Sequence, residues 1–193
     1  MAQGKQALEA DDAFNRGFYY NSIEMYKKAY TEEKKASEKA ALIFKVAEAY
    51  RMLGDAENAQ VWYEKANKAQ YPDPITYYYI GTSLKDQGKY ADAIVAFNKY
   101  KEKNPGDPRT EAQLAACTEA QKWIDNPSRY KADPEVLLNT PQYDLSPAFA
   151  DKKNSDLVFS SSRPASTGTE TDGIVGESFA DLYGSSRDKL GKW

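Results

Sequence analysis

The sequence contains no histidine and a single cysteine, Cys117, among its 193 residues. One cysteine cannot form a disulfide within the chain, and a zinc site made of cysteine and histidine lacks its ligands. The absence of histidine also removes the commonest general base, and neither a glycine-rich phosphate loop nor a nucleophile elbow occurs. We therefore expect no enzyme, no catalytic residue, no metal and no cofactor.

The chain also lacks long apolar runs and a strong charge of one sign. No stretch approaches the roughly 18 apolar residues of a membrane helix, and the formal net charge of −3 gives no basic footprint for nucleic acid. The segment from Met1 to Lys5 lacks the basic and apolar parts of a signal peptide. Two alternatives follow: a cytosolic protein, or an exported protein written without its signal peptide.

What the sequence does contain, between Gln6 and Asn126, is apolar residues at helical spacing. Glycine and proline interrupt this pattern, for example at Gly17, Gly54 and Gly88. The pattern predicts helices over residues 6–16, 20–32, 37–53, 56–69, 74–87, 90–103 and 108–125.

The helical region repeats itself. Gly54 and Gly88 lie 34 residues apart, and matched residues surround them at the same interval. The matched pairs are Ala47 and Gly81, Tyr50 and Leu84, Ala59 and Ala93, Tyr63 and Phe97, and Ala66 and Tyr100. A less faithful copy precedes them around Gly17, and the helix from Glu111 to Trp123, with Leu114 and Ala115 in register, is expected to cap the array. A fixed period of this kind predicts a solenoid of stacked helix pairs.

These residues resemble the tetratricopeptide repeat (TPR) family in their period, their small residues, the aromatic residue of each second helix and the terminal Pro105. The sequence departs from the family at Ile43 and Tyr77, where a tryptophan is usual. The resemblance implies a mainly α fold over residues 1–126: a right-handed solenoid of about three repeats with a capping helix. It further implies a concave groove that binds a protein or peptide.

In that family, first-helix residues outside the framework line the groove. The resemblance places there Asp11, Asn15, Phe44, Glu48, Arg51, Met52, Tyr78, Thr82 and Lys85. Asp11 and Glu48 stand where a carboxylate-clamping subgroup has neutral or basic residues, so we do not expect capture of a C-terminal carboxylate. Core packing is the expected role of the tyrosines at 77–79 as a group, with Tyr78 facing the groove as the expected ligand contact.

The composition changes after Pro127. Residues 127–140 have the character of a linker, and polar turns then bound three predicted strands, Leu145–Phe149, Asp156–Ser161 and Ser178–Tyr183. The stretch from Arg163 to Glu177 is rich in small residues and predicts a long loop.

Residues 141–193 resemble the WD-like β-propeller repeat of bacterial envelope proteins. The resemblance lies in Asp144-x-x-Pro147-x-Phe149, in the run from Leu157 to Arg163, and in Asp181-Leu182-Tyr183. It implies a partial propeller blade in which Asp144 bonds to turn backbone and Phe159 packs between blades. Because a propeller needs several blades, we expect an N-terminal piece of a longer protein.

TPR repeats followed by such a propeller resemble an envelope arrangement of Bacteroidota-type bacteria, which often continues to an OmpA-like peptidoglycan-binding domain. Some of those proteins belong to the type IX secretion and gliding machinery. The resemblance implies a periplasmic scaffold at the outer membrane whose partners are outer-membrane or secretion proteins, with peptidoglycan bound only through a domain absent here. The alternative is a cytosolic TPR adaptor, similar to a co-chaperone, with a disordered C-terminal tail.

Overall fold

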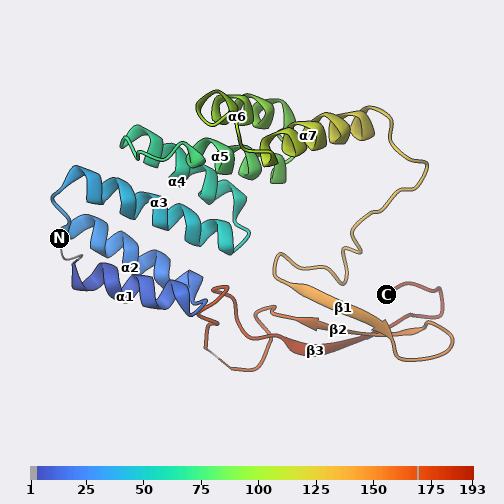
Figure 1. Cartoon of the computed structure of the whole chain (residues 1–193). Coiled ribbons are helices and arrows are strands. Elements are labelled where there is room, and N and C mark those ends of the chain that lie inside the picture. Colours follow the sequence, from blue (N-terminus) through green and yellow to red (C-terminus); the bar gives the residue numbers. More distant parts are fainter. Residues whose placement is uncertain (1–3, 169) are drawn as a thin grey trace. The chain divides into compact units, whose positions relative to one another are not determined.

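The computed structural model describes residues 4–168 and 170–193. Contacts within the chain divide it into two compact units, Met1–Ser128 and Arg129–Trp193. The first is helical and the second contains a small sheet, and each is described by itself (Figure 1).

Within the described residues the helical unit has seven helices. They are α1 (Lys5–Asn15), α2 (Tyr19–Glu32), α3 (Ala36–Met52), α4 (Ala56–Lys68), α5 (Ile75–Asp86), α6 (Tyr90–Lys103) and α7 (Arg109–Asp125). Each predicted helix is confirmed to within one residue at either end. None of the helices described here is both long enough and apolar enough to cross a membrane.

Glycine closes the first helix of each pair. Gly54 and Gly88 have φ angles of 75° and 74°, in the left-handed region that side chains disfavour. The amides of the residues that follow them bond back to the carbonyl oxygens of Tyr50 and Leu84. The two repeats therefore form the turn between their first and second helices in the same way.

Each helix packs against the next one along the chain. The small framework residues Ala47, Ala59 and Ala93 are fully buried, as are the rings of Tyr63 and Phe97. These positions form the interior of the helix pairs, as predicted. They belong to a core of two apolar clusters, one around α1 to α3 and one around α3 to α7.

Helix α7 buries one face only. Thr110 and Cys117 lie against the stack, while Trp123 is 70% exposed. Ala115 is exposed rather than packed in register, because no second helix follows α7 to cover the face on which Ala47 and Gly81 pack in the earlier repeats.

The second unit contains a three-stranded antiparallel sheet in its described residues, in the order β1 (Asp144–Phe149), β2 (Asp156–Ser161) and β3 (Asp181–Ser186). The third strand begins three residues later than predicted. Asp181 pairs with Ser161 and accepts hydrogen bonds from Thr167, which fixes the start of β3. Ser178 instead forms an isolated bridge with Thr171.

A polar network holds one end of this sheet. The carboxylate of Asp144 accepts hydrogen bonds from the Thr140 amide at 2.6 Å and from Arg163 at 2.9 Å. The predicted bond from Asp144 to turn backbone is thus confirmed, and bonds from Ser161 and Thr140 hold the Asp144 pKa below its usual value. Phe159 is buried beside Tyr183. The described strands number three, whereas a propeller blade has four.

Candidate interaction surface

Side chains of α1, α3, α5 and α7 contact one another from helix to helix and form a polar row. We call this set the first-helix row. It consists of Asp11, Lys45, Glu48, Arg51, Tyr79, Lys85 and Gln113, in chain order.

At the α1–α3 step, the carboxylate of Asp11 accepts hydrogen bonds from the Lys45 ammonium at 2.7 and 2.8 Å. It also accepts one from the Tyr26 hydroxyl at 2.7 Å. Burial of Tyr26, and then the Asp11 charge, raise the pKa of this hydroxyl. Asp11 therefore joins three helices, which explains why an acidic residue occupies this predicted groove position.

At the α3–α5 step, the guanidinium group of Arg51 binds the carboxylate of Glu48 at 2.7 Å and lies 4.7 Å from the centre of the Tyr79 ring. The buried hydroxyl of Tyr63 donates a hydrogen bond to the same carboxylate. Burial and the Glu48 charge together raise the pKa of Tyr63. Glu48 is thus neutralised within the protein, and Arg51 is held over an aromatic ring.

At the α5–α7 step, the ammonium of Lys85 donates to the Gln113 side-chain oxygen at 2.7 Å. The amide of Gln113 reaches the Tyr78 hydroxyl at 3.4 Å, and the Arg109 guanidinium lies 4.9 Å from the Tyr78 ring centre. Lys85 differs from Lys45 and Arg51 in that its described hydrogen bond goes to an uncharged amide.

The predicted orientation of Tyr78 toward the groove is wrong. Only 7% of Tyr78 is exposed, and its ring lies edge-on to Phe97 and Tyr100 at 5.6 and 5.4 Å between ring centres. The contacts from Arg109 and Gln113 explain the difference, because α7 covers the ring. Tyr78 is a core residue that reaches the row through its hydroxyl, at Gln113, and through the edge of its ring, at Tyr79.

The other predicted groove residues differ in their exposure. Phe44 stacks on Tyr71 at 4.4 Å between ring centres, and the Thr82 hydroxyl donates to the backbone of α5. Met52 is 41% exposed and Asn15 is exposed at the end of α1. Asn15, Met52 and part of Arg51 are consequently the predicted residues most accessible to a partner.

Sequence reasoning missed three members of the row, Lys45, Tyr79 and Gln113. They recur at intervals of 34, one residue after Phe44 and Tyr78 in the repeat. In each case they contact a predicted groove residue of the preceding repeat. The period alone could have identified them, had α7 been treated as a row-forming helix as well as a cap.

The row combines charged groups, amide groups and aromatic surface. Among the residues that the structure describes, no group of three or more acidic, cysteine or histidine side chains could hold a metal ion. The row offers the hydrogen-bond donors of Arg51 and Lys85 and the aromatic surface of Tyr79 beside Arg51, and Met52, which follows Arg51 in the sequence, is 41% exposed. Such a mixture suits a polypeptide segment with both polar and apolar groups.

No protein-family model and no curated protein matches the chain. Solved structures do match it. A structure of the UNC-45 chaperone is 18% identical with a TM-score of 0.56, and the match covers 65% of this chain but 14% of that one.

The TPR domain of Sgt2 from Aspergillus fumigatus is 22% identical with a TM-score of 0.54, over 67% of this chain and 85% of that one. The C-terminal TPR-containing domain of a Plasmodium falciparum FK506-binding protein is 19% identical with a TM-score of 0.53. That match covers 63% of this chain and 89% of that one. At these identities the likeness concerns the fold, and it shows that the helical unit is a TPR-type stack of helix pairs.

Proposed function

We propose that this protein is a non-enzymatic interaction scaffold whose first-helix row binds a segment of a partner protein. The observation that carries this proposal is the set of contacts between neighbouring repeats that links Asp11 to Lys45, Arg51 to Tyr79 and Lys85 to Gln113. These contacts hold the polar side chains of four helices in fixed positions before any partner arrives. Preorganisation of this kind reduces the entropy lost on binding.

Fold likeness supports the same class of function by analogy. The matched UNC-45 structure concerns a chaperone that binds and folds muscle myosin, so its ligand is a protein. This chain would share the binding of a polypeptide, without sharing that partner.

The charges of the row constrain the partner. Asp11 and Glu48 are each paired with a cation inside the protein, so a C-terminal carboxylate finds no cluster of unpaired bases. The segment that fits would place backbone carbonyl groups or single polar side chains near Arg51 and Lys85, and an apolar side chain against Met52.

A double variant tests the row. Arg51→Ala with Met52→Ala should weaken partner capture about tenfold or more, since it removes a charged donor and an exposed apolar contact. Val61→Ala, on an apolar residue of α4 that is 57% exposed against 41% for Met52, is the matched control and should leave capture unchanged. Equal capture by both variants and the parent would refute this placement of the binding surface.

The finer proposal is a scaffold of the bacterial envelope, periplasmic and associated with the outer membrane, with a role in type IX secretion or anchoring. Its support is the sheet of the second unit, where Leu145, Phe149 and Leu182 are each at least half exposed. Such residues would be covered if further blades packed on the sheet.

The helical unit supports a cytosolic adaptor equally well. Fractionation of the source cells distinguishes the two locations: recovery with the periplasmic or outer-membrane fraction would favour the envelope. Recovery with cytosolic markers alone would exclude it.

A further inference from the structure

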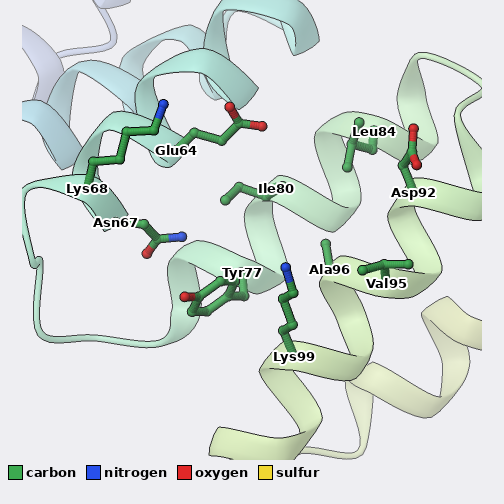
Figure 2. A pocket seen from close by; sticks show the side chains of 10 residues that line it. All are labelled: Glu64, Asn67, Lys68, Tyr77, Ile80, Leu84, Asp92, Val95, Ala96 and Lys99. Atoms are coloured by element: carbon green, nitrogen blue, oxygen red, sulfur yellow. The ribbon is translucent and has the colours of Figure 1, made fainter.

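A second surface lies on the opposite side of α5 from the row contacts, in a hollow between α4 and α6 (Figure 2). The hollow has a volume of about 350 Å³, within the range of ligand-binding pockets. We call it the α5 pocket. Its lining residues are Glu64, Asn67, Lys68, Tyr77, Ile80, Leu84, Asp92, Val95, Ala96 and Lys99.

The floor of the α5 pocket is apolar and its rim is charged. Ile80, Leu84 and Ala96 are each 6–7% exposed, and Figure 2 shows Ile80 and Leu84 extending from α5 and Ala96 from α6. Lys99 lies on the rim beside them. The pocket therefore offers an apolar base, and its charged lining holds the ammonium groups of Lys68 and Lys99 and the carboxylates of Glu64 and Asp92.

The preceding repeat contains the same site, but there the protein fills it. Subtracting 34 from Ala96 gives Trp62. The indole of Trp62 packs in an apolar cluster with Val46, Tyr50 and Tyr30, and Val46 and Tyr50 are the counterparts of Ile80 and Leu84.

Two ammonium groups lie over this indole. Lys65 is 4.1 Å from the Trp62 ring centre and Lys27 is 5.9 Å away. A cation over an indole face is the most favourable cation–π pair. The chain thus displays, at one junction of its repeats, a complete arrangement for holding a tryptophan side chain.

At the next junction the indole is absent, and the α2 side chains Lys27 and Tyr30 have Glu64 and Asn67 of α4 as their counterparts. Lys99 is the counterpart of Lys65, and the apolar floor is retained, but Ala96 replaces Trp62. A cavity of about 150 Å³ lined by apolar side chains already suffices to bind benzene. The α5 pocket is larger, and it opens to the outside past the exposed Val95.

We propose that the α5 pocket binds a tryptophan side chain, or an aromatic ring of similar size, presented by a segment of a partner protein. The ring takes the place that Trp62 occupies one repeat earlier, and the ammonium of Lys99 lies over its face. The attraction is that between the positive charge of the Lys99 ammonium and the electron-rich face of the bound ring. This second docking point is independent of the first-helix row.

Methyl NMR of the full chain tests the proposal, with a capped Gly-Trp-Gly peptide as the probe and capped Gly-Leu-Gly as its matched control. The tryptophan peptide should shift the methyl signals of Ala96, Ile80 and Leu84 in a saturable way. The leucine peptide should bind roughly tenfold more weakly, because it lacks the ring that Lys99 faces. Absence of saturable shifts at these methyl groups, or equal binding of both peptides, would overturn the proposal.

Substitutions localise the effect. Ala96→Trp should fill the pocket and abolish binding, whereas Ala91→Trp, at an exposed position of the same helix, should bind like the parent. Lys99→Ala, a milder change at the rim, should weaken binding about threefold and keeps the test valid if Ala96→Trp does not fold. Retained binding in a folded Ala96→Trp, or full affinity in Lys99→Ala, would contradict the site.

A second copy of this chain is the competing occupant, because Trp123 is 70% exposed. If the Ala96 methyl signal moves with protein concentration in the absence of peptide, and stops moving in Trp123→Ala, the occupant is another copy and the proposal of a different partner is wrong. If the signal is independent of concentration, the partner assignment stands. Neither outcome bears on the first-helix row, whose test uses Arg51 and Met52.

Discussion

Single residues set how closely the paired helices approach. Gly81 shows this most clearly, because an added Cβ would lie 2.6 Å from the ring of Phe97. That ring is fully buried and has no room to retreat. In the preceding repeat the same position holds Ala47 against Tyr63, so the spacing of each pair is adjusted to its own residues.

Gly81→Ala should therefore lower the free energy of unfolding by about 1–3 kcal/mol, as other overpacking changes do. Gly106→Ala is the control, since a Cβ there meets nothing within 4 Å; it should change stability by less than about 0.5 kcal/mol. Urea denaturation followed by circular dichroism measures both. Equal stability of the two variants would mean that α5 and α6 pack differently.

The buried hydroxyl of Tyr63 makes stability depend on alkaline pH. Burial and the Glu48 charge raise its pKa in the folded state, so its contribution is fully present below the unfolded tyrosine pKa of about 10. Above that pH the unfolded chain loses this proton while the folded protein keeps it, and stability falls. Tyr63→Phe removes the proton, so its stability should decline less than that of the parent between about pH 9 and pH 12. Parallel stability curves for the two proteins would disprove the linkage.

At the scale of helices, the junctions between repeats differ in whether a side chain of the protein fills the gap between the second helices of neighbouring repeats. Trp62 fills the gap between α2 and α4, where it contacts Tyr30, Tyr50 and two lysines. Ala96 leaves the next gap open. The two junctions therefore have the same backbone plan with different stability and different accessibility.

Trp62→Ala should cost about 2–4 kcal/mol of unfolding free energy, somewhat less than a fully buried tryptophan because the indole is half-buried. Val61→Ala, on the neighbouring residue that is 57% exposed, should cost less than about 1 kcal/mol. Thermal and urea unfolding give both values. A loss for Trp62→Ala no greater than for Val61→Ala would show that the indole does not hold the junction.

The helices were predictable because every repeat carries local signals: glycine at positive φ ends the first helix, and small residues recur at a fixed interval. The burial of Tyr78 was not predictable, because it depends on α7, whose position against α5 is a tertiary contact. The start of β3 was missed for a similar reason. Asp181 and its bonds to Thr167 fix it, and no pattern within the strand itself reveals them.

The candidate surface likewise has a part that could be predicted from the sequence and a part that could not. The resemblance to the TPR family predicts groove positions for Asp11, Glu48, Arg51 and Lys85, and in the structure all four belong to the first-helix row. Their pairing could not be read from the sequence, because Asp11 and Lys45 meet only when α1 packs beside α3.

At the scale of the whole molecule, the chain is two units joined through an exposed segment. Residues 121–137 are exposed throughout, and residues beyond Asn126 leave the helical pattern. The helical unit has its own apolar core, so its fold does not depend on the sheet.

Brief digestion with trypsin should therefore cut first at Arg129 or Lys131, both exposed. The N-terminal fragment should keep the helical circular dichroism signal and the unfolding midpoint of the intact chain. Initial cleavage inside α3 to α6, or loss of helix content in the fragment, would contradict an autonomous helical unit.

The central claim, that the first-helix row binds a partner, is tested most directly by crosslinking in the source cells. A photoreactive amino acid in place of Met52, the residue that follows Arg51 of the row, is compared with the same amino acid in place of Val61, on α4; both side chains are exposed, at 41% and 57%. We expect a discrete crosslinked protein species from position 52 that is absent from position 61. Crosslinks of equal yield and identity at both positions, or a discrete species from position 61 alone, would contradict the account.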